Sequence, residues 1–228
     1  THELKGVGKN LQDHIGVVSQ FSSTKPVTLH RSATTFRTAL AGIQYLLLGT
    51  GDAANPPTAG GAFIKSHPDK DIPDMQIHYV SIAVPDVHGR ADIPTEHGFS
   101  SIVYACRPQS RGHITLKSSN AEDAPLMFPN YLSEEQDLID TRNGFRETRR
   151  VFMQEAFDEY RGDQLKPGPD VNVDDDRELD QWIRETGESL YHPIGTCKMG
   201  SDDMSVTNEH GQVHGVSGLR VVDASLMP

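Results

Sequence analysis

Three segments of the chain alternate between apolar and polar residues, and this pattern limits the fold more than any other feature. They cover residues 75–84, 98–106 and 112–117, with Pro and Gly residues between them. A period of two residues is typical of a half-buried β-strand. Successive strands separated by turn residues pair most simply as antiparallel neighbours. The sequence therefore predicts an antiparallel sheet.

Helical spacing of apolar residues predicts three helices around this sheet. The first covers residues 33–48 and ends at Gly49. The second begins at Ser133, because Ser133 and Gln136 are spaced as a capping box. The third begins near residue 174 and ends at Gly187. Shorter strands are expected at residues 15–21, 60–64 and 219–222, and the rest of residues 50–74 is expected to be loop.

Composition and charge exclude several classes of protein. The 228 residues are 36% hydrophobic and 23% charged, without the long apolar run of a membrane span. A net charge of -11 argues against nucleic acid as a partner. Cys106 and Cys197 lie too far apart for a redox or zinc motif, which favours a reducing compartment. Because the chain begins with Thr1 and stops at Pro228, just after a predicted strand, we expect it to be a fragment.

Among the eleven histidines, His192 has the surroundings best suited to proton transfer. Pro193 favours an extended conformation at His192, and Gly195 and Gly200 permit a tight loop after it. An imidazole with a pKa of about 6.5 can accept the proton of an alcohol near neutral pH. The residues alone leave a structural role for His192 open.

Oxidation of an alcohol also requires an acceptor for the hydride, and no side chain can serve as one. A cofactor must take this role. The sequence holds no G-x-G-x-x-G fingerprint followed by a helix. The main domain that binds the cofactor is therefore absent or lies outside these residues.

A metal site is the first alternative, and the pattern argues against it. His210 and His214 have the spacing of two zinc ligands on a helix. Gly211, Gly215 and Gly218 disfavour a helix there, so we predict no metal.

Other reactive groups have simpler interpretations. The acidic run at residues 174–176 suits the positive end of a helix better than a metal. A serine hydrolase is disfavoured because no G-x-S-x-G elbow is present. Cys197 beside Lys198 is either an activated thiolate or, more simply, a small hydrophobe in a packed loop.

Six motifs occur in the order found in a known family. The sequence resembles the glucose–methanol–choline (GMC) flavoprotein oxidoreductases, and among them the choline dehydrogenase-like bacterial alcohol dehydrogenases. The motifs are GKNLQDH at 8–14, RPQSRG at 107–112, PNYL at 129–132, HPIGTCKMG at 192–200, VHGV at 213–216 and DASLMP at 223–228.

The resemblance implies an α+β fold, in which an antiparallel sheet with flanking helices forms the substrate-binding domain. Edge pieces of an incomplete FAD-binding domain are expected beside it. Residues 1–14 would then be the exit from the FAD-binding domain and residues 15–190 the substrate-binding domain. Residues 191–228 would form the active-site loop and the return to the FAD-binding domain.

The resemblance also implies FAD as cofactor and assigns roles to individual residues. His192 matches the active-site histidine that takes or stabilises the proton of the substrate hydroxyl while hydride passes to the flavin. Asp223 and Ala224 match the segment that touches FAD. The second catalytic residue of the family, a His or Asn, would lie beyond Pro228.

The implied reaction is oxidation of a primary alcohol, choline-like, aliphatic or aromatic, to an aldehyde. Oxygen or a quinone would reoxidise the flavin, and we expect a cytoplasmic location or a peripheral one at the inner membrane face. Two alternatives remain: a non-catalytic cap or interaction domain, and a GMC-like lyase.

Overall fold

The computed structural model describes residues 2–32, 35–54, 56–84 and 96–228, and the chain forms two compact units. The first unit contains residues 1–15, 107–137 and 189–228, and the second contains residues 16–106 and 138–188. The second unit holds most of the regular secondary structure, whereas turns dominate the first.

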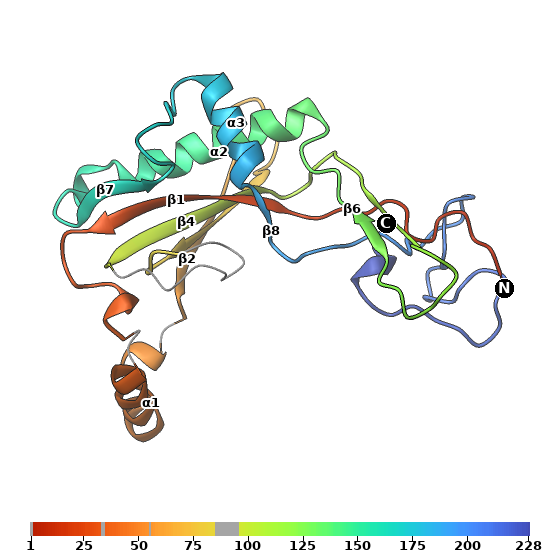
Figure 1. Ribbon diagram of the computed structural model, residues 1–228, viewed down its shortest axis with the longest axis horizontal. Coiled ribbons are helices and arrows are strands. Elements are labelled where there is room, and N and C mark those ends of the chain that lie inside the picture. The colour runs from red at the N-terminus through yellow and green to blue at the C-terminus, as the bar shows by residue number, and fades with distance from the viewer. Residues whose placement is uncertain (1, 33–34, 55, 85–95) are drawn as a thin grey trace. The chain divides into compact units, whose positions relative to one another are not determined.

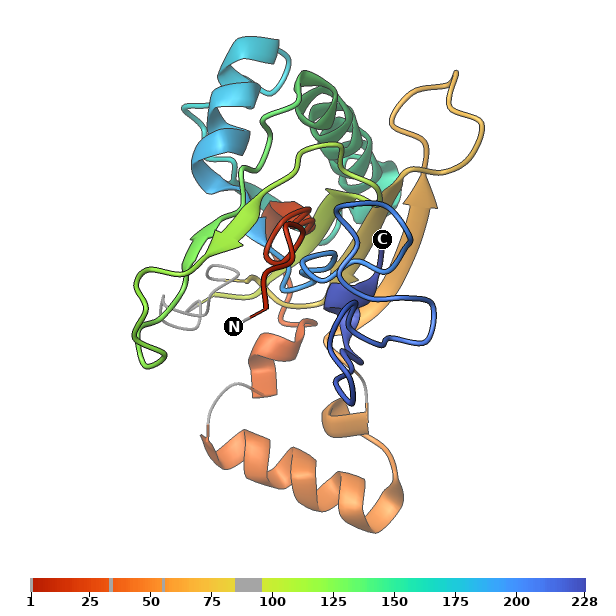
Figure 2. The same cartoon turned by 90° about the vertical axis from the view of Figure 1, so that its right-hand side faces the viewer.

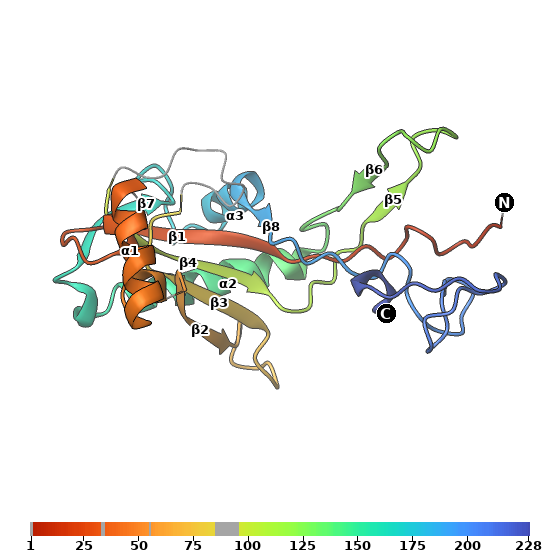
Figure 3. The ribbon, with the colours of Figure 1, turned by 90° about the horizontal axis from the view of Figure 1, so that it is seen from below.

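The main sheet has six strands in the order β2-β3-β4-β1-β7, and the sixth, β8, pairs with β1 (Figure 3). The pairs β2–β3, β3–β4, β4–β1 and β1–β7 are antiparallel, which confirms the predicted sheet. The strands are β1 (Ile15–Ser23), β2 (Thr58–Ile64), β3 (Met75–Val80), β4 (Gly98–Ala105), β7 (Arg161–Lys166) and β8 (Glu188–Ser189).

Two helices cover one face of this sheet, α2 (Glu135–Phe152) and α3 (Asp176–Thr186) (Figure 1). Phe145 of α2 is fully buried, and its ring lies 5.1 Å from that of Trp182 on α3. Gly144 lets α2 approach the sheet closely, because a Cβ there would lie 2.6 Å from Cε of Met75 and 3.2 Å from Cγ2 of Val103. The core therefore lies between the sheet and these helices.

The two helices begin differently from each other. Asp175 caps α3, as its side chain accepts hydrogen bonds from the backbone N–H groups of Arg177 and Glu178. The acidic run thus serves the helix end, as predicted. Helix α2 begins at Glu135, two residues after Ser133, so the capping-box prediction placed its start too early. The η3 turn (Glu155–Phe157) follows α2.

Helix α1 (Thr35–Leu48) forms as predicted, although residue 33 lies outside the described part. It lies apart from the sheet, between η1 (Leu29–Ser32) and η2 (Asp52–Ala54) (Figure 2). Its apolar stripe is exposed, with Phe36 at 74% and Leu47 at 77%. None of the described helices has both the length and the apolar character of a membrane span.

Two strand predictions differ from the structure, the first only in the partner of the strand. Residues 112–117 form β5 (His113–Thr115), which pairs with β6 (Leu126–Phe128) in a separate two-stranded sheet and not with β4 (Figure 3). The alternating pattern specifies a strand but not its partner. Residues 219–222 form a single bridge from Gln212 to Arg220 instead of a strand. A turn at Gly218, with φ of +80°, precedes them, and the η4 turn (Ala224–Leu226) begins soon after them.

Replacing Phe145 with Ala is expected to lower the free energy of unfolding by about 3–5 kcal/mol, because it leaves a cavity where α2 packs on the core. Phe36→Ala is the matched control, since Phe36 lies on a helix but is 74% exposed, and it should change the value by less than about 0.5 kcal/mol. Urea unfolding followed by circular dichroism measures both. Equal losses would contradict the placement of the core.

Candidate active site

Two segments of the first unit lie side by side, residues 8–14 and 190–196. The backbone N–H of Leu190 donates to the carbonyl of His14 at 3.0 Å, and Gln12 and Ile194 exchange two hydrogen bonds at 3.1 and 2.8 Å. Three residues separate Leu190 from Ile194, whereas one residue separates His14 from Gln12. The longer segment must therefore bulge outward at residues 191–193.

The sequence of the bulge explains its conformation. Tyr191 has a φ of +62°, in the left-handed region, which turns the chain away from its neighbour. Pro193 has no N–H group, so it needs no hydrogen-bond acceptor at this point. Between them, His192 is exposed. The bulge thus presents the imidazole of His192 outside the paired backbone.

The carboxylate of Asp13 lies opposite the bulge and fixes it. Its Oδ1 accepts hydrogen bonds from the backbone N–H groups of His14 at 2.8 Å and His192 at 3.0 Å. Its Oδ2 accepts from the hydroxyls of Tyr131 at 2.5 Å and Ser189 at 2.6 Å. One acid therefore connects three stretches of chain that are distant in sequence.

Tyr131 remains a hydrogen-bond donor over a wide pH range. Burial and then the hydrogen bond to Asp13 raise the pKa of Tyr131 to about 12. A phenol with such a pKa keeps its proton and so continues to donate to the carboxylate. Tyr131 thus supports Asp13 without adding a charge to the site.

The side chain of His192 contacts that of His14. Their Nδ1 atoms lie 3.0 Å apart, and the rings are perpendicular with centroids 5.2 Å apart. This is hydrogen-bond distance, so one ring donates and the other accepts. The site therefore contains two histidines whose rings contact each other and whose backbone N–H groups bind one carboxylate.

The second predicted segment, Asp223–Ala224, lies beside the loop that follows His192. The backbone N–H groups of Gly195 and Cys197 donate to the carbonyls of Ala224 at 3.4 Å and Ser225 at 2.8 Å. Asp223 begins the η4 turn (Ala224–Leu226), and its side chain accepts from the N–H of Ser225. A hydrogen bond from the side chain of Ser225, and then the one from its N–H, lower the pKa of the Asp223 carboxyl. The structure thus brings the predicted residues into one unit.

Sequence reasoning missed four residues of this arrangement: Asp13, His14, Tyr131 and Ser189. Three of them lie in the motifs at 8–14 and 129–132, but no role was assigned to them. The adjacent acid and histidine at Asp13 and His14 were the available signal. Ser189 gave none, because its role depends on a contact with a residue 176 positions away.

The comparisons with known proteins show the family of the chain. The family model for GMC oxidoreductase matches residues 108–228, more than half of the chain. The chain belongs to the GMC oxidoreductase family.

Curated relatives extend the similarity over the whole sequence. An oxygen-dependent choline dehydrogenase of Pseudomonas fluorescens is 43% identical over 227 residues, covering 100% of this chain and 39% of the relative. One of Chromohalobacter salexigens is 41% identical and covers 100% of the chain and 40% of the relative. The GMC chain thus spans about two-fifths of the length of these relatives.

Solved structures show the same fold. Formate oxidase from Aspergillus oryzae superposes with a TM-score of 0.87 at 21% identity, over 98% of this chain and 43% of that one. Pyridoxine 4-oxidase from Mesorbium loti gives 0.75 at 21% identity, over 99% and 40%. Together with the family model, these likenesses confirm the predicted α+β fold.

The other reactive residues of this GMC chain are engaged differently. Gly211 and Gly215, each with a φ of +71°, place His210 and His214 in turns and not on a helix. The ring of His214 contacts the carbonyl of Gly200 at 3.0 Å. Within the described residues, no three His, Cys, Asp or Glu side chains are grouped so that they could hold a metal ion.

The second unit contains a separate polar cluster on the sheet. Nε2 of His78 lies 2.9 Å from the hydroxyl of Tyr104 and 3.2 Å from Nε2 of Gln76. Burial, and then Cys106, raise the pKa of Tyr104 to about 12, so its hydroxyl keeps its proton. Val103, the neighbour of Tyr104, faces α2, so Tyr104 lies on the opposite face of the sheet.

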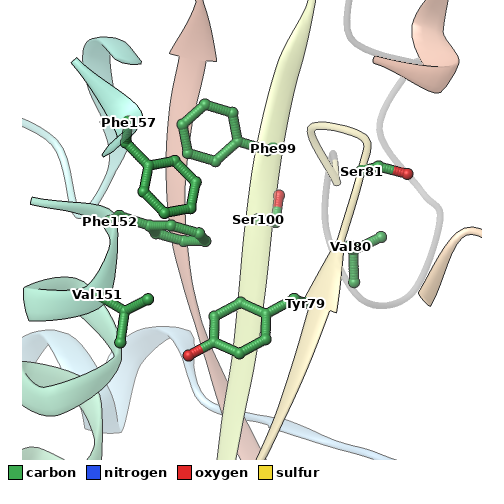
Figure 4. A pocket seen from close by; sticks show the side chains of 8 residues that line it. All are labelled: Tyr79, Val80, Ser81, Phe99, Ser100, Val151, Phe152 and Phe157. Atoms are coloured by element: carbon green, nitrogen blue, oxygen red, sulfur yellow. The ribbon is translucent and has the colours of Figure 1, made fainter. Parts of the chain in front are cut away.

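A cavity of about 270 Å³ also lies in the second unit, between the sheet and the end of α2 (Figure 4). Aromatic rings pack around it, with those of Phe99 and Phe152 5.0 Å apart. The lining of this cavity contains no carboxylate, histidine or cysteine side chain. The lining residues are Tyr79, Val80, Ser81, Phe99, Ser100, Val151, Phe152 and Phe157.

Gly195→Ala is expected to disturb the loop that carries His192. Gly195 has a φ of +91°, and a Cβ there would lie 2.4 Å from the carbonyl oxygen of Asn10. Gly218→Ala is the matched control, because Gly218 has a φ of +80° but open space around it. The control should lose about 1–2 kcal/mol for its backbone conformation, and Gly195→Ala about 1–3 kcal/mol more for the clash. Urea unfolding compares them, and equal losses would refute the close packing.

Proposed function

We propose that the protein containing this chain is an FAD-dependent oxidoreductase that oxidises a primary alcohol to an aldehyde. The observation that carries the proposal is the exposed imidazole of His192, held on a bulge by Asp13 and coupled to His14. The family of the chain and its choline dehydrogenase relatives support an alcohol as substrate. Choline-like, aliphatic and aromatic alcohols all fit this chemistry.

His192 serves as the catalytic base in this proposal. It accepts the hydroxyl proton, so that electron density on the oxygen can form the carbonyl bond as the C–H bond breaks. Bound FAD supplies the acceptor for the hydride, which no side chain can provide. Asp13 keeps the imidazole in place because it holds the backbone N–H of His192.

The edge around Asp223 fits the cofactor. Asp223 and Ala224 are exposed, and the neighbouring Val222 is 80% exposed. The Asp223 carboxylate can accept further hydrogen bonds, so it suits the hydroxyl groups of a ligand better than its phosphates. The apolar side chain of Val222 suits an uncharged part of the ligand. We propose that Asp223 and Ala224 contact FAD at this edge.

The proposal also extends to the parts of the longer protein. Residues 1–14 are the exit from an FAD-binding domain, and residues 15–190 form the substrate-binding domain. Residues 191–228 form the active-site loop and the return to the FAD-binding domain. A His or Asn beyond Pro228 supplies the second catalytic group. Oxygen or a quinone reoxidises the flavin.

His192→Ala should slow reduction of the flavin by roughly 10²-fold or more in the intact, FAD-loaded protein, because the hydroxyl proton loses its acceptor. Stopped-flow absorbance of the flavin with a series of primary alcohols measures the rate. His210→Ala is the matched control, since His210 lies in an exposed turn, and it should keep the wild-type rate.

Two results would reject the proposal. One is a His192→Ala protein in which every alcohol reduces the flavin as fast as it does in the wild-type protein. The other is a wild-type protein that binds FAD but is reduced by no alcohol; product formed without flavin reduction would then indicate a lyase, and no product a non-catalytic cap.

A further inference from the structure

The apolar cavity of the second unit lies where α2 ends against the sheet (Figure 4). Its lining comes from the end of β3, the beginning of β4, the end of α2 and the η3 turn, all of which belong to this unit. Ring carbons make up much of the wall, because four of the lining residues are aromatic: Tyr79, Phe99, Phe152 and Phe157.

The ring of Phe152 holds this aromatic wall together. Its centroid lies 5.0 Å from that of Phe99, 5.3 Å from that of Phe157 and 5.8 Å from that of Tyr79. All three pairs meet edge to face, which is a favourable geometry for aromatic rings. A ring that turned into the cavity would lose such a contact, so the walls resist collapse.

Arg161 fixes the backbone behind two of these rings. Its Nη1 donates a hydrogen bond to the carbonyl of Phe152 at 2.7 Å, and its guanidinium forms an ion pair with Asp158, the residue after Phe157. The N–H of Phe157 donates to the carbonyl of Gln154 at 2.9 Å. The end of α2 and the η3 turn are thus tied together, and the two rings keep their positions.

The polar groups of the lining offer water little in this cavity. The hydroxyl of Ser100 lies 2.9 Å from the carbonyl of Ile82 and 3.0 Å from Oε1 of Gln20, so it is already engaged. The hydroxyl of Ser81 points away from the rings in Figure 4. Burial raises the pKa of Tyr79, so its side chain stays neutral. An ordered water typically needs about two to four polar partners, and an apolar molecule can displace water that lacks them.

The size and the charge of the cavity define what can fill it. Its volume is about 270 Å³, whereas an engineered apolar cavity of roughly 150 Å³ in another protein is large enough to bind benzene. No lining side chain carries a charge at neutral pH, so an ion would lose hydration without gaining a counter-charge. These properties select an uncharged occupant.

We propose that this cavity is a binding site for a small, uncharged, apolar molecule about the size of one aromatic ring. The molecule packs against rings that already contact one another, so binding requires no rearrangement of the wall. The transfer of its apolar surface out of water stabilises the complex. Binding makes and breaks no covalent bond, so the inference goes beyond the proposed function and does not depend on it.

Calorimetric titration of the intact, FAD-loaded protein with toluene tests the proposal. Toluene should bind, and Val151→Phe should weaken binding by about 10-fold or more, because the larger side chain occupies the space that buries the ligand. Val27→Phe is the matched control, since Val27 is 54% exposed and lies outside the lining, and it should stay within about 2-fold of the wild type. FAD content and the midpoint of thermal unfolding verify that both variants are folded. No binding up to saturation with toluene, or equal affinity in the wild type and Val151→Phe, would overturn the proposal.

Two charged probes test the class of ligand. Tetramethylammonium would enter a cavity that recognises cations through the faces of its rings. Benzoate has a ring of the right size but carries a negative charge. We expect that neither probe displaces toluene, even in large excess, because the lining supplies no counter-charge. Displacement by either ion would contradict an uncharged ligand.

A crystal of the intact protein soaked with bromobenzene locates the site without any variant. The anomalous signal of bromine should lie among the rings of Phe99, Phe152 and Phe157. Bromine found only elsewhere, or nowhere, would reject the proposal, and this result decides it even if Val151→Phe does not fold. None of these measurements requires oxidation of an alcohol, so failure of the proposed function and failure of this inference are separate results.

Discussion

The carboxylate of Asp13 is the constraint on which the arrangement around His192 depends. Its two oxygens accept hydrogen bonds from His14, His192, Tyr131 and Ser189, which belong to three separate stretches of the chain. Hydrogen bonds to a charged group each contribute about 1.5–3 kcal/mol, so losing the acid would leave several donors without their acceptor. The loop that carries His192 is therefore held mainly by polar contacts.

The two units are stabilised by different interactions. The second unit has a conventional core, in which Phe145, Leu179 and Ile183 are fully buried between helices and sheet. The first unit is built largely from turns and bridges, with acids as junctions. Asp137, for example, accepts from the backbone N–H groups of Gln109 and Ser110, as Asp13 does from His14 and His192. Irregular backbone of this kind places a side chain at an exposed bulge. In a regular strand, the backbone of the same residue would be paired with a neighbouring strand.

Local patterns predicted the scaffold better than the site. Alternation identified β3 and β4, and helical spacing identified α1, α2 and α3, because these periods reflect one buried face. The same patterns did not reveal that β5 pairs with β6, since pairing depends on distant residues. The sequence singled out His192 because Pro193 and two glycines follow it closely. Asp13 and Ser189 were missed because their roles arise from contacts between residues 176 to 179 positions apart.

The most direct test of this account is the rate of flavin reduction by an alcohol in FAD-loaded Asp13→Ala, compared with Asp13→Asn. The Asn side chain keeps an oxygen for the two backbone N–H groups, and its NH₂ group can donate to the hydroxyls of Tyr131 and Ser189 after these rotate. The account predicts a loss of roughly 10²-fold in Asp13→Ala, comparable to removing the base, and a rate within about 10-fold of wild type in Asp13→Asn. A wild-type rate in a folded Asp13→Ala protein would contradict it.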